Sequence, residues 1–346
     1  MSGSPPPSHP PTPLLTGLLK QVSRSFYLTL RILPQPVRQP ISLAYLLARA
    51  TDTIADTSII PVNQRLHALD QLRHHILNPS PQNHGPNFGQ LAANQANPAE
   101  KELLSRIHEA LTALHQTPPD DTRDIQEVLE IITSGQTLDL QRFQHLQPGQ
   151  VHALESLEEL DDYTWRVAGC VGQFWTRVCS RKLYPHSSLD LPSMIKDGIR
   201  FGKGLQLVNI LRDLPADLQQ GRCYLPHQEL AKLPLQPQDL LNPKNETTLR
   251  PLYQNLVAQA QDHLTAGWRY TCNLPHSPIR LRLACAWPIL IGASTLQKLS
   301  RNTILDPTHR IRIQRSEVYK IIRLTLWRLP RPSAWQRLFH DCSQTQ

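Results

Sequence analysis

The chain has 346 residues, enough for a sizeable buried core, and its formal net charge is +8. A basic balance suits an anionic membrane surface, a polyanionic substrate or nucleic acid, but no nucleic-acid-binding motif accompanies it, so we expect no nucleic-acid partner. The six cysteines form no CxxC pair and no zinc-binding cluster, which argues against a structural zinc site and predicts a reducing, cytoplasmic location.

The chain begins with a stretch rich in Pro and Ser that lacks the apolar run of a signal peptide, so we expect a disordered tail over residues 1–13. Because no composition break follows, we predict one domain over residues 14–330. Residues 78–98 are rich in Asn, Gln, Pro and Gly and are expected to form a mobile surface loop. Residues 331–346 are expected to form a C-terminal tail.

Strand signals are scarce, whereas apolar residues recur at helical spacing in long windows that prolines separate. Two such series are Leu43, Leu46, Leu47, Ala50 and Ile54, and Leu205, Val208, Leu211 and Leu214. The pattern predicts an all-α bundle of many helices. No run reaches the roughly 18–20 unbroken apolar residues of a membrane span.

A first pair of carboxylates lies at Asp52 and Asp56, four residues apart and therefore on one helix face. Like charges at this spacing repel one another, so a pair on a mostly apolar helix calls for a counter-ion. Arg49 lies three residues earlier on the same face, and guanidinium groups bind phosphate oxygens through two parallel hydrogen bonds.

A second pair lies at Asp213 and Asp217, with Arg212 and Arg222 nearby. Carboxylates for Mg²⁺ and arginines for phosphate together describe a diphosphate site. Pro215 lies within this pair, so we predict that the helix kinks there or ends near residues 219–221.

A simpler interpretation of either pair is an intrahelical salt bridge, such as one from Arg49 to Asp52. For a single Asp-x-x-x-Asp this interpretation is the better one. Two pairs, each beside an arginine and flanked by apolar residues, favour metal and diphosphate binding.

Four segments, in this order, resemble the squalene/phytoene synthase family over roughly residues 18–319. They are Ser23-Arg24-Ser25-Phe26, Tyr45-x-x-x-Arg49-x-x-Asp52-x-x-x-Asp56, Tyr163-Thr-Trp-Arg-Val-Ala-Gly-Cys-Val-Gly172, and the segment from Gly202 through Gln206, Asn209, Arg212, Asp213 and Asp217 to Gly221-Arg222-Cys-Tyr224-Leu-Pro226.

The resemblance implies an isoprenoid-synthase helical bundle with a central cavity and a catalytic role for both aspartate pairs. It implies Mg²⁺ ligands at Asp52, Asp56, Asp213 and Asp217. It also implies substrate contacts at Ser23, Ser25, Phe26, Arg49, Gln206, Asn209, Arg212, Arg222 and Tyr224. Tyr45 and Tyr163 would lie at the reaction centre, and Tyr163 is the candidate for assisting proton transfer; by chemistry alone Tyr163 fits a core tyrosine equally well.

Within the family, Asp52-Thr53-x-x-Asp56 is more like the squalene synthases, whose substrate is farnesyl diphosphate and whose reductant is NADPH. Ala55 stands where squalene synthases commonly carry an acid, and we expect no membrane-spanning C-terminal helix, which is more like the bacterial members. The alternatives are synthesis of presqualene diphosphate, dehydrosqualene or phytoene without reduction, or a non-catalytic binding protein on the same fold.

Two basic segments near the C-terminus suggest further contacts. Arg310, Arg312 and Arg315 resemble a late basic segment that would take the phosphates of NADPH, although a solvated loop explains them nearly as well. Residues 317–331 mix apolar residues with Lys and Arg, which suits peripheral association with an anionic inner membrane face. A last bundle helix with a basic outer face is the simpler alternative. The sequence leaves the oligomeric state open, and we favour a monomer.

Overall fold

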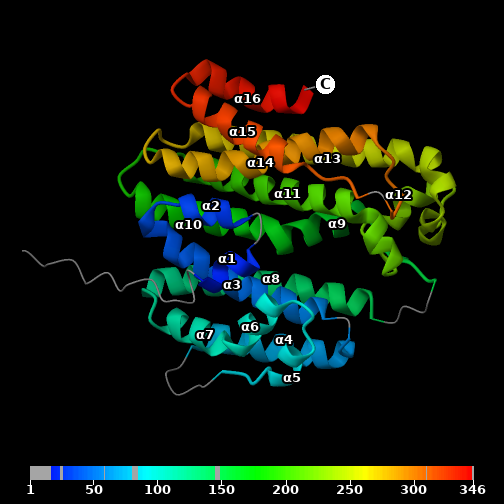
Figure 1. The fold of residues 1–346 in the computed structure, drawn as a ribbon, viewed down its shortest axis with the longest axis horizontal. Coiled ribbons are helices and arrows are strands. Elements are labelled where there is room, and N and C mark those ends of the chain that lie inside the picture. The colour runs from blue at the N-terminus through cyan, green and yellow to red at the C-terminus, as the bar shows by residue number, and fades with distance from the viewer. Residues whose placement is uncertain are drawn as a thin grey trace, which may run out of the picture. The chain divides into compact units, whose positions relative to one another are not determined.

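The computed structural model describes residues 17–23, 26–57, 59–79, 85–144, 149–308 and 310–344, and almost all of its regular structure is helical (Figure 1). The predicted all-α class is therefore confirmed. The predicted tail over residues 1–13 lies outside the described residues. The described residues divide into two compact units, one formed by residues 17–31 and 35–129, the other by residues 32–34 and 130–344. The single domain expected over residues 14–330 stays a prediction.

The first unit is built from short helices around one long one. Its elements are α1 (Leu19–Val22), α2 (Tyr27–Ile32), α3 (Gln35–Asp56), α4 (Val62–Leu77), α5 (Gly89–Ala93), α6 (Pro98–Ser105), α7 (Ile107–His115) and the first half of α8 (Pro119–Arg142). Helix α3 contacts α1, α4, α6 and α7. The apolar series predicted for this helix, from Leu43 to Ile54, is buried.

The second unit contains the remaining elements. They are the end of α8, β1 (His152–Ala153), α9 (Leu157–Thr164), the π-helical turn η3 (Trp165–Gly169), α10 (Cys170–Leu183), α11 (Leu191–Gln219), β2 (Arg222–Cys223), α12 (His227–Ala231), η4 (Pro237–Leu241), η5 (Pro243–Asn245), α13 (Glu246–Asn273), α14 (Ile279–Arg301), α15 (Arg315–Arg328) and α16 (Pro332–Gln344). Strands β1 and β2 form one short parallel pair, with His152 opposite Arg222.

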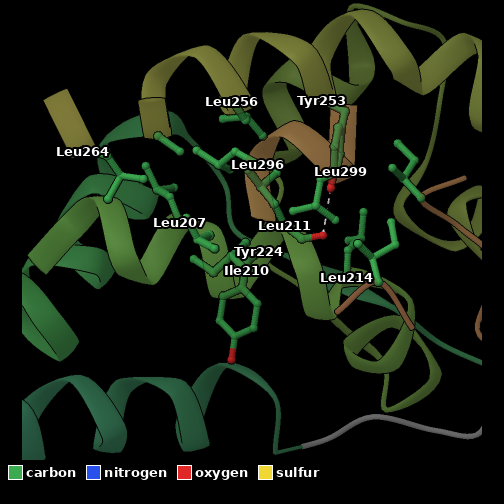
Figure 2. Packing of buried hydrophobic residues seen from close by; sticks show 14 of the residues in the cluster. Leu207, Ile210, Leu211, Leu214, Tyr224, Tyr253, Leu256, Leu264, Leu296 and Leu299 are labelled. Atoms are coloured by element: carbon green, nitrogen blue, oxygen red, sulfur yellow. Dashed lines mark hydrogen bonds between the residues drawn. The ribbon is translucent and has the colours of Figure 1, made fainter. Parts of the chain in front are cut away.

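Helices α11, α13 and α14 run side by side and form the core of the second unit (Figure 1). Figure 2 shows leucines of all three helices pointing toward one another, with the Tyr253 hydroxyl donating to the carbonyl of Leu211 at 3.0 Å. By length and composition α14 could cross a membrane, but 72% of its apolar window is buried, so it serves as a core helix.

Glycines allow α11 to approach the helix formed by α9, η3 and α10 very closely. A Cβ on Gly172 would lie 1.8 Å from the carbonyl oxygen of Gly198, and one on Gly202 would lie 2.1 Å from that of Ala168. No side chain fits into such a contact. Gly202 and its neighbour Gly204, which faces α13, therefore serve helix packing in this fold.

Two segments that were expected to be irregular contain helix. The loop predicted over residues 78–98 contains α5, and Phe88, Leu91 and Ala92 are buried there because this short helix packs against α6. The C-terminal tail predicted over residues 331–346 instead forms α16. Proline and polar residues at its start concealed a helix whose apolar side reaches the core of the second unit.

Trp335 anchors α16 and is 1% exposed, with its ring stacked on Trp268 at 5.5 Å and the Arg282 guanidinium 5.0 Å from its centroid. We predict that Trp335→Ala lowers the free energy of unfolding by about 3–5 kcal/mol, because a large cavity is created. Trp327→Ala is the matched control: this tryptophan is 61% exposed, and a change within about 0.5 kcal/mol is expected. Urea unfolding of both variants measures the difference, and equal stabilities would contradict the packing of α16.

Candidate active site

Helix α3, in the first unit, has one side that is not buried, and we call this side its open stripe. From Ile41 to Asp56 its side chains are buried except those of Tyr45, Ala48, Arg49, Asp52 and Asp56. Their spacing of three and four residues places them on one face. Four of the five are residues singled out from the sequence, so the structure brings Tyr45, Arg49 and both aspartates together.

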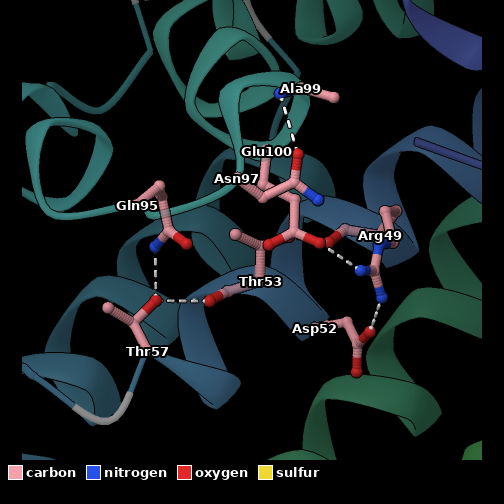
Figure 3. A network of polar contacts seen from close by, with 8 residues as sticks. All are labelled: Arg49, Asp52, Thr53, Thr57, Gln95, Asn97, Ala99 and Glu100. Carbon is pink, nitrogen blue, oxygen red and sulfur yellow. Dashed lines mark hydrogen bonds and ion pairs between the residues drawn. The ribbon is translucent and has the colours of Figure 1, made fainter. Parts of the chain in front are cut away.

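Arg49 holds this stripe in place through two carboxylates (Figure 3). Its guanidinium forms ion pairs with Asp52 on the same helix and with Glu100 at the start of α6. Asn97 caps α6 by accepting a hydrogen bond from the Ala99 amide at 3.0 Å, which fixes the turn that carries Glu100. The sequence analysis missed Glu100, because an acid in a polar first helical turn is an ordinary capping feature.

The two aspartates of α3 disfavour each other's charge. Partial burial raises the pKa of Asp52 to about 7, and the nearby charge of Asp56 acts in the same direction against the lowering effect of Arg49. The Asp52 side chain keeps 42% of its surface accessible to solvent, so an ion can reach it. A carboxylate pair with this repulsion and access fits Mg²⁺, which binds one or two protein carboxylates together with water and phosphate oxygens.

The first predicted segment is only partly described. Phe26 stacks on Tyr45 with ring centroids 5.3 Å apart, which adds an aromatic wall to the open stripe. Ser23 is buried and its hydroxyl donates to the Leu19 carbonyl at 2.5 Å. Its predicted role toward the diphosphate stays a prediction. Ser25 lies outside the described residues.

Helix α11 carries the second stripe, in the second unit. Gln206, Asn209, Asp213 and Asp217 follow one another at spacings of three and four residues, and none of them is buried. The helix continues through Pro215 and ends at Gln219, so both aspartates lie on helical turns. Of the two predicted alternatives, a kink at Pro215 or an end near residues 219–221, the structure shows the end.

Two arginines converge on Asp213. Arg212 donates to its carboxylate at 3.0 and 2.5 Å, and Arg310 donates to the same group at 2.8 Å. Burial would raise the pKa of Asp213, but hydrogen bonds and charges from these arginines outweigh it and lower the pKa. Asp213 therefore remains ionised, in contrast to Asp52.

The segment predicted for NADPH does not act as one group. Arg310 contacts Asp213, whereas Arg312 and Arg315 are exposed and form no ion pair within the described part of the chain. Lys298 donates to the Arg312 carbonyl at 3.4 Å and so fixes the backbone there. The NADPH role of these arginines stays a prediction.

Tyr163 lies in the last turn of α9, two residues before the π-helical turn η3 begins. Such turns re-aim side chains and are frequent at functional sites. The Tyr163 ring stacks on Tyr224 at 4.8 Å, and the Tyr224 hydroxyl donates to both carboxylate oxygens of Asp139 at 2.9 and 3.1 Å. Arg222 lies 3.6 Å from the same carboxylate.

Asp139 is a site residue that the sequence analysis missed. It lies in the last turns of α8, and its only sequence signal is an acid flanked by leucines. Its side chain is 14% exposed, and it joins Tyr224 and Arg222, both of which were predicted.

These surroundings keep the tyrosines protonated. Burial raises the pKa of Tyr163 well above its usual value, and Tyr224 and Asp139 reinforce the shift. Burial also raises the pKa of Tyr224, again with Asp139 contributing. At neutral pH Tyr163 is therefore a neutral hydroxyl, which can donate a hydrogen bond or pass on a proton but does not act as a phenolate base.

Within the described ranges, no group of three or more His, Cys, Asp and Glu side chains comes together as a metal site. Each aspartate pair offers two carboxylates. This donor set suits a hard cation that completes its shell with substrate oxygens and water.

The comparisons with known proteins identify the class. The sequence model of the squalene/phytoene synthase family matches residues 19–317, so the chain belongs to this family of prenyltransferase-type enzymes, whose members bind isoprenyl diphosphates. It is 25% identical over 288 residues to the squalene synthase ERG9 of Saccharomyces cerevisiae, covering 82% of this chain and 61% of that enzyme. The chain thus spans less than two thirds of the yeast protein.

A bacterial relative and a solved structure add to this. The presqualene diphosphate synthase of Zymomonas mobilis is 29% identical over 253 residues, covering 73% of each protein. The structure of TcSQS with the ligand E5700 superposes with a TM-score of 0.72 at 20% identity, covering 94% of this chain and 95% of that one. This likeness confirms the predicted terpenoid-synthase fold.

The raised pKa of Asp52 predicts that protons compete with Mg²⁺ at the α3 stripe. The apparent Mg²⁺ affinity, measured by calorimetry, should rise between about pH 6 and about pH 8, because a metal ligand must be deprotonated. Without Mg²⁺ the protonated carboxyl favours the folded state, so the free energy of unfolding should fall as the pH rises toward about 7.

Asp52→Asn should abolish both effects. Asp213→Asn should leave the loss of stability with pH in place, because the pKa of Asp213 is lowered. An unchanged pH dependence in Asp52→Asn would contradict the assignment.

Proposed function

We propose that this chain is a Mg²⁺-dependent squalene synthase, which joins two farnesyl diphosphates head to head through presqualene diphosphate and reduces the product with NADPH. The observation that carries the proposal is the pair of helical stripes on α3 and α11. Each presents an Asp-x-x-x-Asp pair beside an arginine on a helix side that is not fully buried. Membership of the squalene/phytoene synthase family supports it.

The chain's own residues have separate tasks in this reaction. Asp52 and Asp56 in one unit, and Asp213 and Asp217 in the other, would hold Mg²⁺, and Arg49 and Arg212 would bind diphosphate oxygens. When bound, Mg²⁺ neutralises the charge that develops on the leaving diphosphate. The arginines contribute to the same effect from fixed positions.

The first half-reaction breaks an allylic carbon–oxygen bond, and the electron pair leaves with the diphosphate. The second farnesyl double bond attacks the resulting cation, and loss of a proton closes the cyclopropane of presqualene diphosphate. The neutral Tyr163 hydroxyl would pass this proton on, with the released diphosphate as the final base. Asp139 would hold the neighbouring Tyr224 hydroxyl and so orient the stacked pair of rings.

The second half-reaction ionises presqualene diphosphate and quenches the rearranged cation with hydride, which NADPH supplies when bound. Arg312 and Arg315 fit its phosphates because both are exposed and lack acidic partners among the described residues. A second candidate is synthesis of presqualene diphosphate alone, which the 29% identity to the Zymomonas mobilis enzyme favours.

Product analysis tests the function. Incubation with farnesyl diphosphate, Mg²⁺ and NADPH should give squalene, and omission of NADPH should leave presqualene diphosphate or dehydrosqualene. Asp52→Asn and Asp213→Asn should abolish turnover while circular dichroism shows a folded protein. Presqualene diphosphate as the product with NADPH present would select the second candidate, and near wild-type turnover in either variant would overturn the metal assignment.

The tyrosine assignment has its own test. Tyr163→Phe should lower kcat by about 10²-fold or more, because a positioned proton-transfer group contributes about that much. Tyr224→Phe and Asp139→Asn should lower kcat less, with KM for farnesyl diphosphate little changed. Tyr253→Phe is the matched control, a buried tyrosine whose hydroxyl bonds only to the Leu211 carbonyl among the contacts described. Tyr253→Phe should lower the stability and leave kcat unchanged. A wild-type kcat for Tyr163→Phe would exclude Tyr163 from the proton transfer.

A further inference from the structure

Helix α15 has one packed side and one open side. Ile321 and Thr325 are 6% and 0% exposed on the side that meets α14 and α16. Tyr319, Leu326 and Trp327 are 65%, 49% and 61% exposed. The helical spacing of these residues places them on the opposite side. We call this side the α15 outer face; it comprises Tyr319, Lys320, Arg323, Leu326 and Trp327, together with Arg331, which follows the helix and covers the Trp327 ring.

This clustering of exposed apolar residues does not recur in the described chain. The other exposed large apolar side chains lie singly, each on a different helix or, for Ile59, in the turn between α3 and α4: Leu28, Ile59, Leu157, Val171, Leu191 and Ile279. Trp327 is the only exposed tryptophan, because the other five are buried or half-buried. Scattered exposed residues need no explanation, but an exposed tyrosine, leucine and tryptophan on one helix side indicate an interaction surface.

The surface is also strongly basic. Both acids of α15 and α16 are already paired, Glu317 with Lys298 at 2.6 Å and Asp341 with Arg328. Five cations of α15, α16 and the turn between them form no ion pair among the residues described: Arg315, Lys320, Arg323, Arg331 and Arg337. Lys320, Arg323 and Arg331 belong to the α15 outer face. The Arg331 guanidinium lies 4.8 Å from the Trp327 ring centroid, so charge and aromatic surface are presented together.

We propose that the α15 outer face docks this chain onto an anionic lipid surface. Tryptophan and tyrosine favour the headgroup region, and a helix with such a face lies in the plane of the interface. Lysine and arginine at its edge are attracted to anionic headgroups. Tyr319 and Trp327 are eight residues apart, about 12 Å along the helix axis, so both rings reach the same surface when α15 lies flat.

The same charges argue against other occupants. In a symmetric dimer this face would meet its own copy, and the unpaired cations would repel one another. A nucleic acid would contact the cations but would leave Leu326 without an apolar partner. A lipid surface satisfies both the cations and the apolar side chains. Docking is independent of which product the enzyme makes.

Sedimentation with phospholipid vesicles tests the proposal. The full chain should bind vesicles containing phosphatidylglycerol and bind phosphatidylcholine vesicles weakly, and binding should fade between about 0.05 M and about 0.5 M NaCl as charges are screened. Lys320→Gln with Arg323→Gln should weaken binding by at least about tenfold. Leu326→Ser with Trp327→Ser should weaken it at both salt concentrations.

Matched controls come from the first unit. Ile59→Ser removes a side chain that is 71% exposed, and Lys101→Gln removes an exposed cation; both should bind as the wild type does. Brominated lipid should quench the fluorescence of Trp327, so Trp327→Phe should lose most of the quenching. Circular dichroism of each variant checks the fold.

Three results would overturn the proposal. The first is negligible binding to both vesicle types, and the second is anionic binding that the α15 variants leave unchanged. The third is self-association that Leu326→Ser with Trp327→Ser abolishes without any vesicle binding, which would make the face a contact between copies of this chain.

Discussion

The close packing of α11 against the helix formed by α9, η3 and α10 is the constraint on which the second unit depends. Backbone meets backbone at Gly172, Gly198 and Gly202, and a single added methyl group would collide with a carbonyl. This contact fixes α11 along the helix that carries Tyr163. Because α11 also packs on α13 and α14, its remaining side is left to carry polar residues.

The two units stabilise their aspartate pairs in different ways. On α3, Arg49 pairs with both Asp52 and Glu100, yet burial and the charge of Asp56 still raise the pKa of Asp52. On α11, two arginines lower the pKa of Asp213. The two pairs look alike in sequence, yet one contains a carboxyl that holds its proton to about pH 7 and the other a carboxylate that stays ionised. Binding of a cation would remove this difference, because it stabilises the ionised form of both pairs.

The tyrosine pair illustrates how packing determines chemistry. A phenol in water can ionise at high pH, but burial holds the Tyr163 proton in place, and the neighbouring Asp139 acts in the same direction. The residue is therefore suited to passing a proton along a hydrogen bond. It is not suited to removing one as a base.

The sequence by itself determined the all-α class and the polar members of both stripes, because helical periodicity is local and spacings of three and four residues define a face without knowledge of the fold. The family followed from the resemblance of four motifs to the squalene/phytoene synthases. The sequence also offered the end of α11 near residues 219–221 as one of two alternatives, the other being a kink at Pro215. It could not supply Glu100 or Asp139, because each acquires its role from a partner distant in sequence, Arg49 for one and Tyr224 for the other.

Only the tertiary structure decided which side of each helix is open. In residues 317–331 the apolar residues looked equivalent in the sequence, but packing against α14 and α16 buries Ile321 and leaves Tyr319, Leu326 and Trp327 exposed. The segment predicted as a C-terminal tail is a packed helix because Trp335 stacks on Trp268, a residue distant in the sequence. The exposure of a residue depends on its neighbours in the fold. The spacing of residues along one helix does not reveal which distant segments will pack against it.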